Sequence, residues 1–141
     1  MERNKRNLAY LAGLFDGEGG ITAAGSVSRF YPRAYIGTTT ESAMRWVQRS
    51  LGGILTPRKI VATYNRKIMW YVCWTNAHDV ARMLKSLLPW LRIKRALAKA
   101  AIQLAGLIGT KAKRPRIQTA SLARRKRLHD RIKRLNGGTG A

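Results

Sequence analysis

Apolar residues near the start of the chain recur at helical spacing: Leu8, Leu11, Leu14 and Phe15. This pattern predicts a helix over about 7–16 with Asn7 as its N-cap. A run of glycines at 17, 19 and 20 follows, and we expect it to end the helix.

Four later segments alternate between apolar and polar residues, which predicts strands. They span about 21–28, 33–40, 54–62 and 67–75, with one turn near Tyr31 and Pro32 and another at 64–66. In the last strand, four large residues share a face and are expected to lie in the core: Ile68, Trp70, Val72 and Trp74. Capped or helix-periodic segments at 40–53, 76–88 and 89–107 predict three more helices.

The predicted order is therefore two successive αββ units followed by further helices. Antiparallel hairpins with helices on one face make an α+β fold, αββαββα, with a polar sheet face left open. We expect one domain over 1–110 and a basic tail over 111–141. The tail predicts a helix over about 118–135, with a disordered glycine-rich end. Its apolar stripe consists of Leu122, Leu128, Ile132 and Leu135.

Charge indicates the partner of this fold. The chain has 28 Lys and Arg against 6 Asp and Glu, a formal net charge of +22, which favours a polyanion such as DNA or RNA. The basic tail helix has three open roles: packing on the domain, lying along phosphates, or lying on a membrane surface.

Other sequence signals limit the location and the chemistry. The single cysteine, Cys73, has no disulfide partner and is expected to be a small buried hydrophobe. The first apolar run is too short for a membrane span or a signal peptide, so we expect a soluble, intracellular protein of a bacterium, a phage or an organelle. There is no GxxxxGK[ST] loop and no CxxC pair, and His78 and His129 are isolated. Carboxylates and basic residues therefore remain as candidate catalytic groups.

The stretch LAGLFDGEG, residues 11–19, resembles the signature of the LAGLIDADG homing endonucleases, with Phe15, Gly17 and Glu18 as its departures. The αββαββα order is also typical of that family, and PWLRIK, residues 89–94, resembles the place where its members carry a catalytic-site lysine. The resemblance implies an endonuclease that hydrolyses a long, nearly palindromic double-stranded DNA site with a divalent metal. The alternative is an RNA maturase or a non-cleaving DNA-binding regulator on the same scaffold.

One motif in the chain implies a homodimer that pairs this helix with its own copy. Small residues at i, i+3, i+4 and i+7 would let two helices approach closely. The predicted interface residues are Ala9, Ala12, Gly13 and Asp16.

Two Glu18 carboxylates would then meet at the negative ends of two helices, a conflict that Mg²⁺ or Mn²⁺ removes. The candidate metal ligands are Glu18 and the Gly17 carbonyl, while Asp16 is expected to bond backbone at the helix end. The resemblance implies that Lys94 stabilises charge in the transition state or contacts a phosphate, and that Thr40 organises water or caps a helix. The candidate catalytic residues are Glu18, Lys94 and Thr40.

Side-chain parity predicts which residues of the open face contact DNA bases. The predicted set is Thr22, Ser26, Ser28, Tyr31, Arg33, Tyr35, Thr56, Arg58, Lys67 and Tyr71. On the same face, Ala24 and Gly37 have little to offer except contact to thymine methyls or contact through water.

Overall fold

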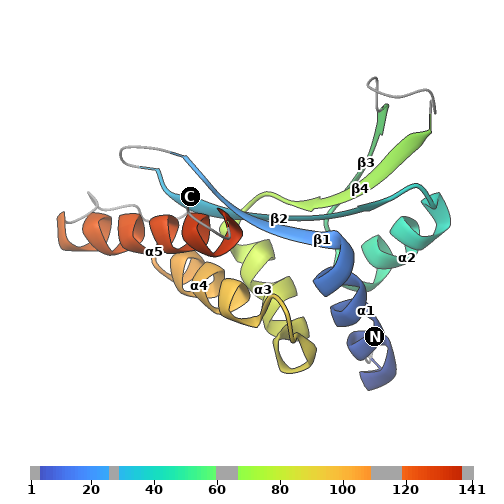
Figure 1. Ribbon diagram of the computed structural model, residues 1–141, viewed down its shortest axis with the longest axis horizontal. Helices are drawn as coiled ribbons and strands as arrows, with labels where there is room; N and C mark the ends of the chain where they lie inside the picture. Colours follow the sequence, from blue (N-terminus) through green and yellow to red (C-terminus); the bar gives the residue numbers. More distant parts are fainter. Residues whose placement is uncertain (1–3, 26–28, 60–66, 109–118, 138–141) are drawn as a thin grey trace.

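The computed structural model describes residues 4–25, 29–59, 67–108 and 119–137 (Figure 1). The elements in these ranges follow the predicted order, so the α+β, αββαββα prediction is confirmed. They are α1 (Lys5–Glu18), β1 (Gly19–Ala24), β2 (Tyr31–Thr38), α2 (Glu41–Leu51), β3 (Ile54–Lys59), β4 (Ile68–Trp74), α3 (Ala77–Leu87), the 3-10 turn η1 (Leu88–Trp90), α4 (Arg95–Gly106) and α5 (Thr119–Gly137). The predicted turn at 64–66, the outer parts of the strands around it and the glycine-rich end lie outside the described residues.

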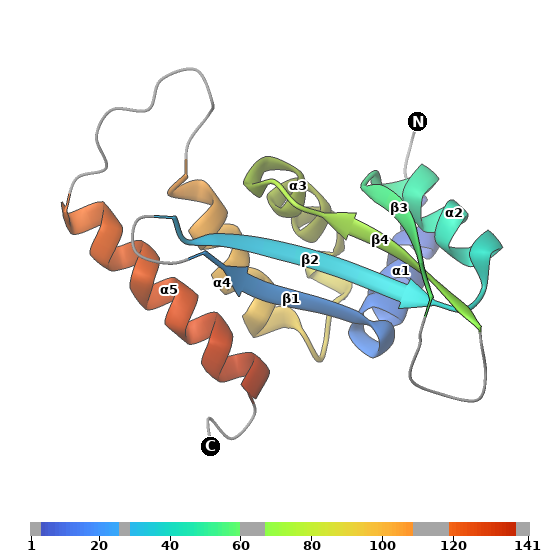
Figure 2. The same ribbon diagram turned by 90° about the horizontal axis from the view of Figure 1, so that it is seen from above.

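The four strands form one antiparallel sheet in the order β1-β2-β4-β3. Residues directly opposite each other on neighbouring strands project from the same face. The helices lie on one side of the sheet (Figure 1), and from above the strands lie in front of α1, α3 and α4 (Figure 2). The opposite face, called the open face below, carries the residues in register with Arg33.

The core lies between the other sheet face and the helices. Trp74 is buried there and its indole N–H donates to the carbonyl of Leu51 at 3.2 Å. The buried residues of the strands alternate with those of the open face, as predicted: Ile21, Ala34, Ile36, Val72 and Trp74. Ile68 was expected in this core but is 40% exposed, because it begins β4 at the outer end of the strand.

The first helix is longer than the sequence pattern indicates. Asn4, not Asn7, is its N-cap, and the Asn4 side chain accepts a hydrogen bond from the backbone N–H of Arg6 at 2.9 Å. Gly17 continues the helix, which ends only at Glu18. Both asparagines have N-cap chemistry, and local sequence does not distinguish them.

The predicted turn at Tyr31 and Pro32 is wrong, since both residues belong to β2. Pro32 pairs with Ala23 of β1, but pairing between β2 and β4 begins only at Ala34. At residue 32 the strand therefore has a neighbour on one side only, where a proline without an N–H is tolerated.

The helix predicted to begin at Pro89 begins at Arg95 instead. A 3-10 turn covers Leu88–Trp90 and the chain then runs non-helically to Lys94. The reason is distant in sequence, because the carboxylate of Asp16 accepts the amide hydrogens of Arg92 and Lys94.

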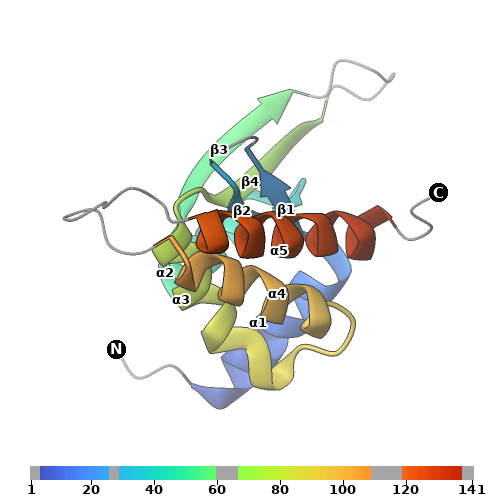
Figure 3. The ribbon, with the colours of Figure 1, turned by 90° about the vertical axis from the view of Figure 1, so that its left-hand side faces the viewer.

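The tail helix α5 packs against α4 and the edge strand β1 (Figure 3). Leu128 and Ile132 are buried in the same core as the preceding elements, whereas Leu135, predicted for that stripe, is 42% exposed. The Asn136 amide donates to the carbonyl of Ile21. Of the three roles predicted for this helix, the structure therefore shows packing on the domain. In the described ranges, every helix is too short or too polar to cross a membrane.

Candidate functional site

The end of α1 is built so that the chain passes directly from helix to strand. The Gly19 N–H donates to the carbonyl of Phe15, and β1 starts at the same residue. A Cβ at Gly19 would lie 2.5 Å from the Phe15 ring, so a larger residue does not fit without a shift. This abrupt exit leaves Gly17 and Glu18 exposed at the helix end.

Asp16, just before these two residues, points into the protein and is 8% exposed. Its Oδ2 accepts the Arg92 N–H at 2.8 Å and its Oδ1 accepts the Lys94 N–H at 2.9 Å. Hydrogen bonds to an ionised acceptor are among the stronger ones in proteins. As predicted, Asp16 bonds backbone, but the backbone belongs to the segment before α4.

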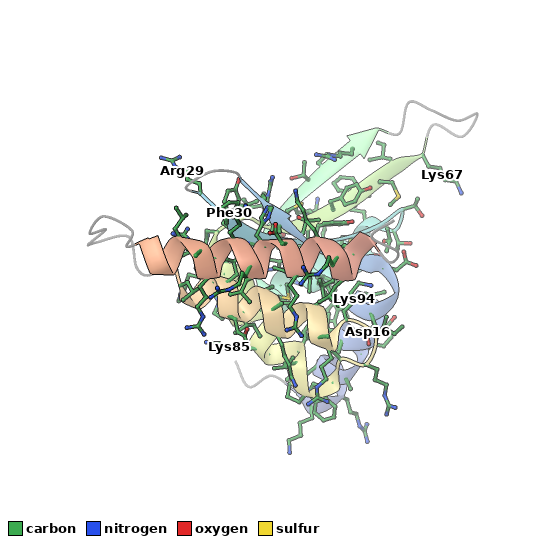
Figure 4. All side chains as sticks on the ribbon, turned by 60° about the vertical axis from the view of Figure 1, so that its left-hand side comes forward. Asp16, Arg29, Phe30, Lys67, Lys85 and Lys94 are labelled. Carbon is green, nitrogen blue, oxygen red and sulfur yellow. The ribbon has the colours of Figure 1, made fainter. Side chains whose placement is uncertain are left out.

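The side chain of Lys94 also binds Asp16. Its Nζ donates to the backbone carbonyl of Asp16 at 2.8 Å, and the two residues lie next to each other in Figure 4. The last turn of α1 contains no basic residue of its own, so Lys94 places a cation at the negative end of the helix dipole. Two residues distant in sequence are thereby held together beside Glu18.

The Glu18 side chain makes no hydrogen bond or ion pair with any part of the chain that the structure describes. An exposed carboxylate and the adjacent Gly17 carbonyl form an all-oxygen donor set, which suits a hard cation such as Mg²⁺. The described residues contain no group of three or more His, Cys, Asp or Glu that would close a metal site. The donors of one chain fit a cation only if phosphate oxygens or a second copy of the chain complete its coordination.

Thr40 lies between β2 and α2 and is exposed. It occupies the N-cap position of α2, but its hydroxyl makes no capping bond. Instead, the backbone N–H of Thr40 donates to the Thr38 hydroxyl at 3.1 Å. Because Gly19 pairs with Ile36, the C-terminal end of β2 lies level with the end of α1, at the same end of the sheet as Glu18.

The predicted interface residues do not share one exposed face. Ala12 is fully buried and Asp16 nearly so, both in the chain's own interior. Gly13 is exposed, and a Cβ added there would meet no other part of the described chain within 4 Å, as is also true of Gly17 one turn later. Tyr10, 64% exposed, completes this face. A helix partner would therefore meet Tyr10, Gly13 and Gly17 rather than Ala12.

The open face carries the predicted base-contacting residues. Their common face follows from register, since Thr22 opposes Arg33, Tyr35 opposes Cys73 and Thr56 opposes Tyr71. Ser26 and Ser28 lie outside the described residues. The members that the structure places on this face, all at least partly exposed, are Thr22, Tyr31, Arg33, Tyr35, Thr56, Arg58 and Tyr71. Lys67 is exposed just before β4 (Figure 4).

Two glycines on this face have a role that the sequence pattern did not indicate. A Cβ at Gly37 would lie 2.5 Å from the ring of Tyr71, and one at Gly20 would lie 2.4 Å from the ring of Tyr35. Each tyrosine ring thus covers the glycine opposite it. The Arg58 guanidinium lies 5.7 Å from the centre of the Tyr71 ring, a cation–π distance. Gly37 was expected to offer DNA little except contact to thymine methyls or through water, but in the structure the Tyr71 ring covers it.

Cys73 is not the buried core residue expected from its strand. It lies on the open face opposite Tyr35 and Ile54 and is half-buried. Burial raises the pKa of its thiol above 9.0, against the opposing effect of the nearby Arg58 and Arg33. The thiol is therefore protonated at neutral pH.

Solved structures of the same architecture include the homing endonuclease I-CvuI, in complex with the I-CreI target in the presence of Mg. It is 26% identical to this chain, with 97% of this chain and 86% of I-CvuI covered and a TM-score of 0.72. The match includes the fold around the motif helix described above. The fold of this chain is that of the LAGLIDADG homing endonucleases.

Two other homing endonucleases share this fold at lower identity. An archaeal intron-encoded homing endonuclease, I-Vdi141I, complexed with DNA, is 14% identical over 92% of this chain and 84% of its own, with a TM-score of 0.70. The homing endonuclease I-TnaI is 13% identical over 93% of this chain and 96% of its own, with a TM-score of 0.64. No protein-family model and no curated protein matches the sequence.

Proposed function

We propose that this LAGLIDADG protein is a site-specific DNA endonuclease that acts as a homodimer with a divalent metal. The observation that supports it is the pairing of Lys94 with the end of α1, beside an acid that stays free. The duplex would lie on the open face, where Arg33 and Arg58 present guanidinium groups suited to guanine in the major groove.

Glu18 and the Gly17 carbonyl of each chain would hold Mg²⁺ or Mn²⁺ together with phosphate oxygens of the DNA. Such a cation supplies an activated water and stabilises charge on the leaving 3′ oxygen in phosphodiester hydrolysis. A two-fold axis near the ends of two α1 helices would bring one Glu18 carboxylate to a phosphodiester bond in each strand of the duplex.

Lys94 would act on the scissile phosphate through its charge. Its ammonium has three donors, and one of them binds the Asp16 carbonyl. The other two remain for phosphate oxygens or for a water, in a fixed position relative to Glu18. Asp16 is a positioning residue in this scheme, because its carboxylate holds the backbone that carries Lys94. Thr40, exposed just after β2 at the end of the sheet where Glu18 lies, would contact water.

Glu18→Gln tests the metal ligand. The variant keeps the size of the side chain but loses a charge. We therefore expect it to bind DNA that carries the target site and to cut this DNA at least 100-fold more slowly than the wild type does (about 3 kcal/mol). Gel-shift and cleavage assays with Mg²⁺ measure the two effects. Glu41→Gln is the matched control, since Glu41 pairs with Arg45 on the surface of α2. Cleavage by Glu18→Gln at the wild-type rate would exclude the proposed metal site.

A further inference from the structure

The outer side of α5 carries four arginines in one line. Arg124, Arg127, Arg131 and Arg134 follow each other at steps of three and four residues, which places them on one stripe of the helix. All four are exposed. We call them the arginine stripe.

The stripe does not serve the stability of α5 itself. Like charges three or four residues apart destabilise a helix by a few tenths of a kcal/mol per pair. Only Arg134 lies in the last turn, where the helix dipole favours a cation. Within the described part of the chain none of the four forms an ion pair.

The helix that carries the stripe is fixed to the sheet. On its inner side the Arg125 guanidinium donates to the carbonyl of Phe30 at 3.2 Å, and the His129 ring packs against the Phe30 ring with 4.7 Å between centres. Asn136 binds the Ile21 carbonyl at the other end of the helix. These contacts hold the stripe at the edge strand β1, beside which α5 lies in Figure 3.

We propose that the arginine stripe binds the phosphate backbone of duplex DNA beyond the part that faces Glu18. From Arg124 to Arg134 the helix rises about 15 Å, the length of roughly four nucleotides along one strand. The planar guanidinium group matches a phosphate bidentately. Since α5 lies at one end of the domain and α1 lies away from it beyond the middle of the sheet (Figures 1 and 2), the stripe contacts the flank of the site. The inference rests on the proposed DNA binding and adds a surface outside the open face.

The test replaces the two central arginines, Arg127→Gln with Arg131→Gln, and measures binding to a long heterologous duplex at increasing salt. Phosphate contacts are independent of sequence, so the target site is not needed. Two lost contacts lower the slope of log affinity against log salt by about two, so a fourfold rise in salt weakens the wild type roughly tenfold more than the variant. Arg49→Gln with Lys85→Gln, which removes two exposed charges from α2 and α3, keeps the wild-type slope. Arg127→Lys with Arg131→Lys keeps both charges, so this variant should have the wild-type salt slope.

If Arg127→Gln with Arg131→Gln has the same salt slope as the control Arg49→Gln with Lys85→Gln, the inference is overturned while the proposed function stays intact. A wild-type protein that does not bind duplex at any salt concentration, or that binds structured RNA in its place, overturns both. Thermal unfolding followed by circular dichroism checks the fold, and the Gln variant should be at least as stable as the wild type because like-charge repulsion is removed.

Discussion

The Asp16 carboxylate is the link between α1 and the segment that carries Lys94, and Asp16→Asn breaks half of it. The carboxylate accepts two backbone N–H groups, from Arg92 and Lys94, at 2.8 and 2.9 Å. An amide keeps one acceptor oxygen but turns an NH₂ group toward the second N–H. One hydrogen bond is lost and a partly buried donor is left without an acceptor.

The expected loss follows from these contacts. A hydrogen bond to an ionised group contributes about 1.5–3 kcal/mol, and an unpaired buried polar group costs about 1–3 kcal/mol. We expect Asp16→Asn to lower the free energy of unfolding by about 2 kcal/mol, which is roughly 8 °C in Tm for a chain of this size. Cleavage should fall as well, because the position of Lys94 beside Glu18 depends on the same contact.

Urea and thermal unfolding followed by circular dichroism measure the loss. Asp79→Asn is the surface control, since the Asp79 carboxylate accepts from the Asn76 amide at 2.6 Å and pairs with Arg82 at the exposed start of α3, where such contacts contribute little. If Asp16→Asn unfolds within about 0.5 kcal/mol of the wild type, the carboxylate does not hold the segment before α4 and the positioning role is refuted.

Two further substitutions use the glycines. Gly37→Ala forces the Tyr71 ring off the strand, so we expect weaker binding to the cognate site with an unchanged salt slope. Gly106→Ala is the control, because a Cβ added at Gly106 would meet no other part of the described chain within 4 Å. It should leave binding unchanged in the same titration. A Cβ added at Gly13 would meet no other part of the described chain within 4 Å, whereas Gly13→Leu blocks close approach of a second α1. We expect a dimeric wild type and a monomeric variant of equal helix content by light scattering, and a monomeric wild type would remove the two-fold mechanism.

The sequence predicted those features of the fold that depend on periodicity. Alternation placed Arg33, Tyr35 and Tyr71 on the open face, because a strand exposes every second residue whatever its partners are. Helical spacing gave the existence of α1 to α5 for the same reason. These predictions do not depend on which helices and strands pack against each other.

The errors lie where a contact between distant segments overrides a local signal. Proline at 89 indicates a helix start, but Asp16 takes the amides of Arg92 and Lys94 and delays α4 to residue 95. The small-residue pattern of α1 indicates one contact face, but the core of the same chain already uses Ala12. Local sequence does not indicate that Gly37 is covered, because the ring that covers it comes from β4, 34 residues later in the chain.

The separation of the two acids in the motif follows from what Lys94 binds. A direct Lys94–Glu18 ion pair would occupy the carboxylate that a cation needs and the ammonium that a phosphate needs. Here the Lys94 ammonium is attached to the carbonyl of residue 16, and the Asp16 carboxylate is attached to the Lys94 backbone. Both of these hydrogen bonds involve Asp16, so Glu18 and Lys94 are held at one helix end without forming an ion pair with each other. In the proposed mechanism aspartate at position 16 supplies geometry and glutamate at position 18 supplies charge. The two substitutions should differ accordingly: Asp16→Asn in stability and cleavage, Glu18→Gln in cleavage alone.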